Sequence, residues 1–334
     1  MGLRLTVDMF SGRPNPTWEV TDPDQVRELV SLLGQGRDAV AELDSGYTGL
    51  GFRGLRVDLT DGLGSEGVEL AEFPQSFKLG GGGAKDASAG AELADRLLAT
   101  IPYDLGEGGG VAVGSTAYAE QVRETAQAEI ARAVGNGPDT ATQHAPPGET
   151  TKSGMSEKML EQLSALRERT VSCPYDSAPF DPAFWNHPAV EPYNNCYAYA
   201  VGLRVDRFAR PGRAHYYEIP ETTVYGYQVA VGLYKDGLTL YGFPCRSGSM
   251  RLIVALYTGR FPPTSTHPQG LRDFHFYRWH AEGYWSHKMA GNAARTTDAA
   301  GQLITDLATM NTGSVYVEPY TEGLFQSHYT VTIA

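Results

Sequence analysis

Apolar and polar residues alternate at the start of the chain, and helix-like spacing follows. The alternation from Leu3 to Val7 is typical of a strand with one buried face, and we predict a strand over residues 3–10. A helix is expected from Pro23, because Asp22 can cap it and proline suits a first turn. The other elements predicted for residues 1–135 are a turn-rich loop at 11–16, strands at 55–59 and 68–70, and helices at 89–101 and 118–134. This part therefore reads as an α+β module.

The second half of the chain reads mostly as strands after a short helical region. Leucines at helical spacing predict an amphipathic helix over residues 157–169. A second helix is expected to begin at Asn194 or Asn195, both of which are good N-cap residues. The expected strands are residues 216–219, 223–233, 238–243, 252–256, 274–279, 284–288, 314–317 and 328–333. The predicted fold class is α+β, and in the second domain a helix packs on an antiparallel sheet.

A change in composition separates the two halves. Of the 19 tyrosines, all but Tyr47, Tyr103 and Tyr118 lie beyond residue 170, and so do all tryptophans except Trp18. Residues 136–150 are rich in Pro, Gly and Thr and show no apolar periodicity. We therefore predict a domain over residues 1–135 that recognises a substrate or partner, a flexible linker over 136–155 and a second domain over 156–334.

The charge balance excludes some classes of partner. The chain carries 27 Lys and Arg against 39 Asp and Glu, a formal net charge of −12. This balance argues against a nucleic-acid partner or an anionic membrane surface, since both need a basic face. No apolar stretch approaches the roughly 20 residues of a membrane-spanning helix. The start of the chain lacks the apolar core of a signal peptide, and the three cysteines cannot form a closed disulfide set, so we expect a soluble, cytoplasmic protein. Its oligomeric state is left open.

Residues 193–203, Tyr-Asn-Asn-Cys-Tyr-Ala-Tyr-Ala-Val-Gly-Leu, carry the first candidate for chemistry. Cys196, Tyr199, Ala200 and Leu203 recur at helical spacing, which places Cys196 in the first turn of the expected helix. At that end the helix dipole favours a thiolate and can lower a thiol pKa from about 8.5 to roughly 3.5–7.5. The alternative is that Cys196 is a small buried residue with only a packing role.

Residues 273–288 carry the second candidate and read as two strands joined at Glu282-Gly283. His275 lies near the start of the first strand and His287 near the end of the second, so a hairpin brings them close. A two-residue loop with perfect alternation would put the two histidines on opposite faces of the hairpin. A bulge at Gly283 would restore a common face.

The chain order is a cysteine on a helix, a histidine on a strand and a polar residue on the next strand. Enzymes with a covalent intermediate use this order for the nucleophile, the base and the group that orients the base. Residues 193–292 resemble in this respect the papain-like NlpC/P60 and CHAP cysteine peptidases and amidases. The interval from His275 to His287 and the glycine turn between them match that arrangement. The run from Cys196 to Ala200 is similar to the Cys-aromatic-Ala-aromatic-Ala run of papain.

The resemblance implies a papain-like catalytic domain and a role for each residue. Cys196 would attack a peptide or other amide bond, forming an acyl-enzyme that is hydrolysed or transferred, and His275 would serve as base and then acid. His287 would fix the tautomer of His275. The backbone N–H of Cys196 with Asn194 or Asn195 would receive the oxyanion, and Tyr193 would adjoin the substrate. No cofactor and no metal is implied.

The sequence is also compatible with other functions for these residues. Cys196, His275 and His287 could ligate zinc, although no short paired spacing of ligands is present. Cys245 beside Arg246 is a second candidate thiol. The domain could also be a non-catalytic peptide- or partner-binding protein on a papain-like scaffold, or an inter-bacterial effector with the same chemistry.

Overall fold

The computed structural model of the chain describes residues 2–43, 45–47, 49–60, 73–105, 116–136, 179–220, 224–240, 250–264, 268–313, 316–319, 324–328 and 332–334. The chain forms two compact units. The first comprises Met1–Met9, Asn15–His144 and Pro262–Leu271, and the second comprises Phe10–Pro14, Ala145–Phe261 and Arg272–Ala334. Helices and antiparallel sheets occur together, which confirms the α+β class. None of the helices in the described part of the chain is long and apolar enough to cross a membrane.

A four-stranded antiparallel sheet forms the centre of the first unit. Its strands are β1 (Leu3–Asp8), β2 (Thr17–Val20), β3 (Gly54–Leu59) and β4 (Ser76–Leu79), in the order β2-β1-β3-β4. The predicted first strand is confirmed but ends two residues earlier, at Asp8. Strand β2 was not predicted, because its four residues directly follow a loop with two prolines. The strand predicted at 68–70 lies outside the described residues.

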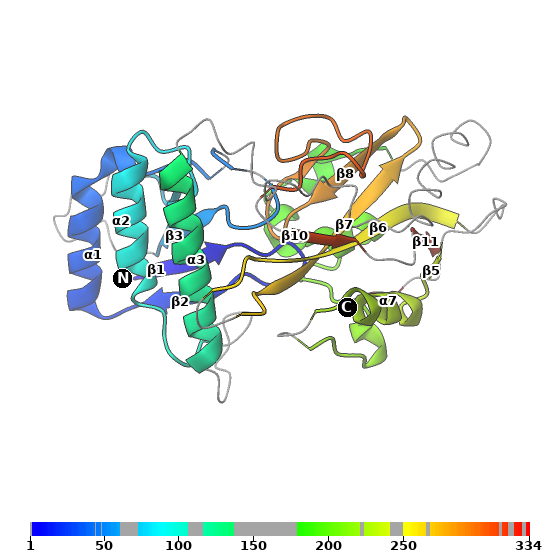
Figure 1. The fold of residues 1–334 in the computed structure, drawn as a ribbon, viewed down its shortest axis with the longest axis horizontal. Coiled ribbons are helices and arrows are strands. Elements are labelled where there is room, and N and C mark those ends of the chain that lie inside the picture. Colours follow the sequence, from blue (N-terminus) through cyan, green and yellow to red (C-terminus); the bar gives the residue numbers. More distant parts are fainter. Residues whose placement is uncertain are drawn as a thin grey trace. The chain divides into compact units, whose positions relative to one another are not determined.

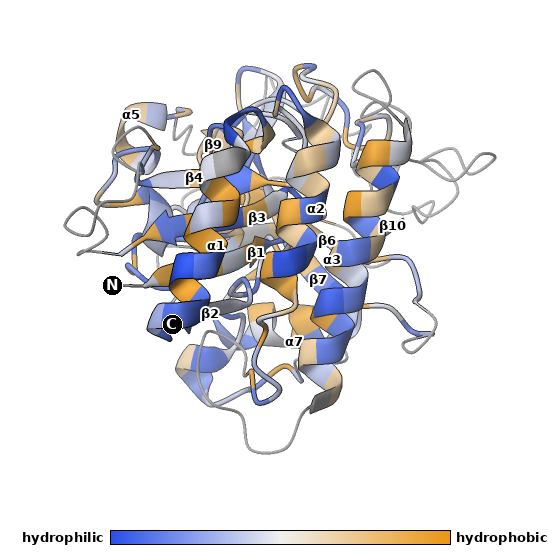
Figure 2. Ribbon diagram, turned by 90° about the vertical axis from the view of Figure 1, so that its left-hand side faces the viewer, coloured by the Kyte–Doolittle hydropathy of each residue, from blue (hydrophilic) through white to orange (hydrophobic). Residues whose placement is uncertain are grey.

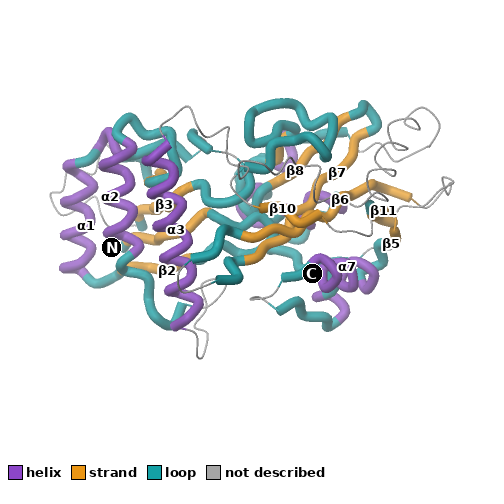
Figure 3. The backbone as a smooth tube through the Cα atoms, in the orientation of Figure 1, coloured by secondary structure: helices purple, strands orange, loops and turns teal. Residues whose placement is uncertain are grey.

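Three helices cover one face of this sheet and lie side by side (Figures 1 and 3). They are α1 (Pro23–Gln35), α2 (Ala87–Leu98) and α3 (Thr116–Asn136). As predicted, the Asp22 side chain caps α1, accepting hydrogen bonds from the N–H groups of Asp24 and Gln25. Each helix carries both hydrophilic and hydrophobic residues (Figure 2), and the apolar ones are buried, for example Val26, Val30 and Leu33 in α1. A 3-10 turn, Arg37–Ala39, follows α1.

The second unit is built on a larger antiparallel sheet. Its strands are β5 (Thr239–Leu240), β6 (Met250–Arg260), β7 (Arg272–His280), β8 (Tyr284–Lys288), β9 (Ala294–Arg295), β10 (Tyr316–Pro319) and β11 (Phe325–His328). The order is β5-β11-β6-β7-β8-β9, and β10 also pairs with β6. The long central strands β6 and β7 pair over seven residues, from Val254 opposite Arg278 to Arg260 opposite Arg272.

Both faces of this sheet are covered, so β7 is buried along its whole length. The helices of this unit are α5 (Pro182–Trp185), α6 (Cys196–Val201) and α7 (Gly226–Lys235), with 3-10 turns at Glu191–Tyr193 and Arg213–His215. Phe274 and Phe276 of β7 belong to the core that includes α6 and α7. Tyr277 and Trp279 belong to a second core, which includes Ile304 and Leu307. Neighbouring residues of β7 therefore face different environments.

The strand predicted at 223–233 is wrong, because residues 226–235 form helix α7. Aromatic and β-branched residues at every second position suggested a strand. In the structure Val229, Ala230 and Leu233 are buried, and this is the spacing of one helix face.

Other predicted strands are shorter than expected or lie outside the described residues. Residues 216–219 form no strand, and Tyr216 is 99% exposed with a φ of 59°. At the chain end the strand covers 325–328, and residues 332–334 are not part of it. The predictions for 137–155, 157–169, 241–243, 314–315 and 329–331 lie outside the described residues, as do Cys173 and Cys245.

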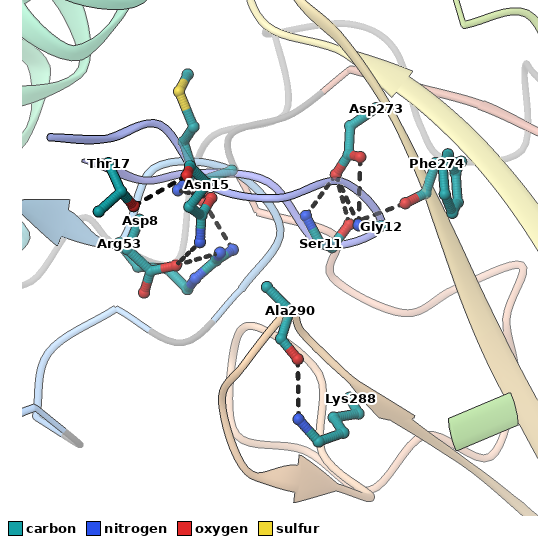
Figure 4. A network of polar contacts seen from close by, with 12 residues as sticks. Asp8, Ser11, Gly12, Asn15, Thr17, Arg53, Asp273, Phe274, Lys288 and Ala290 are labelled. Atoms are coloured by element: carbon teal, nitrogen blue, oxygen red, sulfur yellow. Dashed lines mark hydrogen bonds and ion pairs between the residues drawn. The ribbon is translucent and has the colours of Figure 1, made fainter. Parts of the chain in front are cut away.

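Residues 10–14 belong to the second unit, although the sequence placed them in the first. Ser11 donates from its backbone N and its Oγ to Asp273 Oδ2 on β7, at 2.5 and 2.6 Å (Figure 4). Gly12 donates to Asp273 Oδ1 at 3.2 Å and lies directly on Phe274. A Cβ added to Gly12 would lie 2.4 Å from the Phe274 carbonyl oxygen and from two of its ring carbons. Only glycine fits this contact.

We expect Gly12→Ala to destabilise the second unit by about 2–3 kcal/mol, because the clash involves backbone and a buried ring that cannot move away cheaply. Three of the four tryptophans, Trp185, Trp279 and Trp285, lie in this unit, so urea unfolding followed by tryptophan fluorescence measures the loss. Gly34→Ala in α1 is the control, since nothing lies within 4 Å of its Cβ position and alanine favours a helix. Unfolding of Gly12→Ala at the wild-type urea concentration would contradict the packing described here.

Candidate functional site

Cys196 is the first residue of α6, as the sequence predicted. The Asn195 side chain caps the helix by accepting a hydrogen bond from Ala198 N at 3.2 Å. Gly202 ends it with a φ of 71°, a left-handed conformation that favours glycine. The side chain of Cys196 is fully buried. The capping residues thus fix the direction of a very short helix and the position of its first side chain.

The sulfur of Cys196 lies against the segment of β7 that carries His275. The Phe274 carbonyl oxygen is 4.0 Å from Sγ, and the Phe276 backbone N–H lowers the pKa of the thiol. These two residues are the neighbours of His275 in the chain. Cys196 shares its core with Phe274 and Phe276, whereas the His275 ring contacts Tyr277, which belongs to the second core. The imidazole therefore lies on the other face of β7 from Cys196, and among the described residues no contact joins the sulfur to the His275 ring as the sequence analysis expected.

His275 and His287 are in direct contact. His275 Nε2 lies 2.8 Å from His287 Nδ1, and both side chains are buried. The hairpin pairs His280 with Tyr284 and Tyr277 with His287, which leaves three loop residues, 281–283. Gly283 has a φ of 95°, so the loop contains the extra left-handed residue of a bulge. This is the geometry that puts the two histidines on one face.

Hydrogen bonding fixes the tautomers of the two rings when both are neutral. His287 Nε2 lies 3.0 Å from the carbonyl oxygen of Thr297, which can only accept, so this nitrogen carries the proton. His287 Nδ1 is then an acceptor, and His275 Nε2–H donates to it. The proton of neutral His275 is therefore on Nε2, and its Nδ1 bears the lone pair that a general base needs.

Burial opposes ionisation of the Cys196 thiol. Its pKa is raised well above the ordinary value, first by burial and second by the negative charge of Asp273. The Phe276 and Tyr197 backbone N–H groups and the Lys288 ammonium act in the opposite direction. The sequence led us to expect a lowered pKa from the helix terminus. The direction is reversed because a six-residue helix cannot offset the loss of solvent around the sulfur.

Lys288, the last residue of β8, is a charged residue of this site that the sequence analysis missed. Its side chain is 0% exposed, and Nζ donates to the carbonyl oxygen of Glu191 at 2.6 Å. Nζ also donates to the carbonyl oxygen of Ala290 at 2.8 Å (Figure 4). Burial lowers its pKa to about 7, while the Glu191 carboxylate and Cys196 raise it. In the sequence, a lysine at the end of a strand is indistinguishable from an ordinary exposed one.

Asp273 is the buried anion of the site. Hydrogen bonds from Ser11 N and Oγ and from Gly12 N hold its carboxylate. Burial raises its pKa, and the bonds from Ser11 and the charge of Arg13 lower it. Asp273 therefore has two effects, anchoring residues 10–14 on β7 and disfavouring a thiolate at Cys196.

The other predicted site residues have structural contacts. The Asn194 amide donates to Val190 O at 2.8 Å and Asp206 Oδ1 at 3.2 Å. The Asn195 amide donates to Gly12 O and Ala209 O, each at 2.8 Å. Both N–H groups of each amide are thus engaged, so neither side chain offers a donor to an oxyanion in this structure. Tyr193 is 52% exposed and is the last residue of the 3-10 turn.

A second polar network lies beside this site. His280 Nε2 contacts Ser286 Oγ at 2.5 Å, and Ser286 also bonds the Tyr199 hydroxyl. The Arg278 guanidinium donates to that hydroxyl at 3.2 Å and stacks over the Tyr199 ring. All four side chains are buried, so the network satisfies polar groups under α6.

Within the described part of the chain, no group of three or more His, Cys, Asp or Glu side chains is arranged to hold a metal ion. The zinc reading therefore gains no support from these residues. The alternative thiol of the sequence analysis, Cys245, lies outside the described residues.

Comparisons with known proteins give one curated relative. Over 137 residues the chain is 34% identical to insoluble matrix shell protein 1 of Ruditapes philippinarum. The match covers 41% of this chain and 83% of that protein. No family model and no solved structure matches the chain.

The buried Lys288 should make stability depend on pH. Its pKa is about 7 in the folded state and about 10.4 in an unfolded chain, so between these values the unfolded state binds more protons and the free energy of unfolding rises with pH. The raised thiol pKa of Cys196 acts in the opposite sense above about pH 9. We therefore expect a rise of about 1 kcal/mol per pH unit between pH 7.5 and 8.5.

Urea unfolding at a series of pH values measures this slope. Lys288→Met should lose it and be at least as stable as the wild type at pH 7, because it removes a buried charge whose hydrogen-bond acceptors are two uncharged carbonyls. The exposed Lys235 provides the control, and Lys235→Met should keep the wild-type slope. Equal slopes in Lys288→Met and the wild type would show that Lys288 is not a buried cation of lowered pKa.

Proposed function

The chain belongs to the family of insoluble matrix shell protein 1, and we propose that its second unit is a papain-like thiol enzyme that hydrolyses or transfers acyl groups at peptide or other amide bonds. The observation that carries this proposal is the oriented histidine pair. The Thr297 carbonyl fixes His287, and His287 fixes His275 with the lone pair on Nδ1. Cys196 at the start of α6 lies against the β7 backbone at Phe274, the residue before His275, while the His275 ring lies with Tyr277 on the other face of β7.

In the proposed mechanism the base and the nucleophile act together. A buried thiol ionises only if its proton passes to a nearby acceptor, because an isolated thiolate is costly in this environment. In this mechanism His275 Nδ1 takes the proton as Sγ attacks the carbonyl carbon of the substrate. The step requires a rearrangement that brings the sulfur and the imidazole, which lie on opposite faces of β7 in this structure, within hydrogen-bond distance. His287 accepts the hydrogen bond from His275 Nε2–H throughout and stabilises the imidazolium that forms.

The acyl-enzyme then forms and is resolved. The imidazolium of His275 gives its proton to the leaving amine as the C–N bond breaks, which leaves a thioester on Cys196. Water or a second amine attacks the thioester, His275 takes the proton of that nucleophile, and the thiol is regenerated. The Asn194 and Asn195 amides are engaged elsewhere, so the backbone N–H of Cys196, which starts the helix and has no intrahelical acceptor, is the expected oxyanion donor.

A second candidate function is supported by the family itself. The relative is named as an insoluble matrix protein of shell, and a structural component of such a matrix needs no catalysis. The complete burial of Cys196 and the raised pKa of its thiol also fit a cysteine with a packing role. Under this candidate the histidine pair would stabilise the hairpin and nothing more.

Amide hydrolysis separates the two candidates. We expect the wild type to release coumarin from a mixed pool of peptidyl-aminomethylcoumarin amides, and Cys196→Ala and His275→Ala to lose at least about a hundredfold, the range for a nucleophile or general base. His187→Ala is the control, since His187 is an exposed histidine of the same unit.

Two outcomes would favour the structural candidate instead. The first is coumarin release that Cys196→Ala leaves unchanged. The second is no release by the wild type together with a Cys196 thiol that iodoacetamide labels only in urea. In either case Cys196→Ala should sediment with insoluble material to the same extent as the wild type.

A further inference from the structure

A serine and a histidine that the proposed thiol mechanism does not use are in direct contact on the α6 side of the sheet. Ser286 is on β8, and its Oγ lies 2.5 Å from Nε2 of His280, the last residue of β7. The same Oγ bonds the hydroxyl of Tyr199 on α6, and all three side chains are buried. A hydroxyl within hydrogen-bond distance of an imidazole is the arrangement of nucleophile and base in serine hydrolases.

Arg278 fixes the direction of this chain of hydrogen bonds. Its guanidinium can only donate, and it donates to the Tyr199 hydroxyl at 3.2 Å. Among the described residues that hydroxyl has one other partner, Ser286 Oγ, so the tyrosine proton is donated there. The serine hydroxyl in turn has one other partner within the described part of the chain, so its proton is donated to His280 Nε2. Neutral His280 therefore carries its lone pair on Nε2, the tautomer that a general base needs here.

Packing holds the tyrosine in place, and the arginine has a donor to spare. Trp185 contacts the Tyr199 ring edge-on with the centroids 5.2 Å apart, and the Arg278 guanidinium lies over its face at 4.3 Å. Arg278 pairs directly with Ser286 in the strand ladder. Its Nε is buried and has no hydrogen-bond partner among the described residues. An unpaired buried donor is costly, so an oxyanion that forms at Ser286 would find a donor beside it.

The side chains around His280 indicate the class of substrate. The Tyr284 ring stacks on the imidazole at 4.8 Å, and Phe180 contacts it edge-on at 6.2 Å. Both aromatic residues are partly exposed, so they lie between the buried pair and the surface. Aromatic surroundings suit an apolar acyl group. An ester suits a site with one base, because its alcohol leaves more readily than the amine of an amide.

We propose that Ser286 and His280 form an esterase site for esters with an apolar acyl group. The site shares no side chain with the proposed thiol mechanism and does not rest on it. With the Tyr284 ring turned aside, Ser286 Oγ attacks the ester carbonyl carbon as its proton passes to His280 Nε2. His280 gives that proton to the departing alkoxide as the C–O bond breaks. Water then attacks the acyl-serine and gives a proton to His280, which returns it to Oγ as the carboxylic acid leaves.

An alkyl fluorophosphonate tests the proposal, because it bonds to a serine whose proton a histidine accepts. Oγ displaces fluoride at phosphorus, and the serine proton leaves through His280. The rate is followed in the folded protein, and peptide mass mapping locates the adduct. We expect the adduct on Ser286 of the wild type and none at this position in Ser286→Ala. His280→Gln should react at least about a hundredfold more slowly, and Tyr284→Ala, which removes the covering ring, should react faster than the wild type. Hydrolysis of p-nitrophenyl butyrate should follow the same order.

Ser88→Ala is the control, since Ser88 is an exposed serine of α2, and tryptophan fluorescence verifies that each variant folds. If a buried variant fails to fold, the wild type and Tyr284→Ala decide the matter, and equal rates in these two proteins would then overturn the inference. A folded wild type without an adduct on Ser286 overturns it whatever the coumarin assay shows, as does an adduct that forms equally fast in His280→Gln. An adduct on Ser286, together with a Cys196 that iodoacetamide labels only in urea, supports this inference and overturns the proposed thiol mechanism.

Discussion

The hydrogen bond between the buried imidazoles of His275 and His287 is the interaction on which the candidate site depends. It exists because the loop between β7 and β8 has three residues. A loop of two residues would place the two rings on opposite faces of the sheet. Gly283 makes the third residue possible by adopting a φ of 95°. A single backbone conformation thus decides whether the second unit has a pair of coupled histidines or two unrelated ones.

Burial is the second constraint, and it acts on every ionisable group of the site. The same desolvation that raises the pKa of Cys196 and Asp273 lowers that of Lys288 to about 7. A buried site of this kind cannot hold one isolated charge, so the charges must come in compensating sets. The segment at Ser11 and Gly12 makes such a set possible, because it binds the anion, the loop beside the cation and the cap of α6.

Local signals in the sequence were enough to predict the start of α1 at Asp22, the cap of α6 at Asn195 and the pairing of β7 with β8. Each of these depends on a few neighbouring residues. Helix α7 was mistaken for a strand because Tyr225, Tyr227 and Val229 alternate, and only tertiary packing shows which of the following residues are buried. Strand β2 was missed because it is short and depends on pairing with β1.

The parts of the site that could not be predicted depend on contacts between distant residues. Lys288 is charged and stands at a strand end, so its burial follows only from the acceptors at Glu191 and Ala290. The contact of Ser11 with Asp273 joins residues more than 250 positions apart in the chain. The reversed direction of the Cys196 pKa also has a long-range cause, since the core that buries the sulfur includes residues of α7, β6 and β7 that are distant from it in the sequence.

The central claim is that His287 holds His275 in the tautomer with its lone pair on Nδ1. Imidazole ¹⁵N chemical shifts, assigned with His275→Gln and His287→Gln variants at a pH where both rings are neutral, test it most directly. We expect a protonated Nε2 in both rings and an unprotonated, acceptor-type Nδ1 in His275. A His275 ring protonated at Nδ1, or shifts of its ring nitrogens that His287→Gln leaves unchanged, would contradict it.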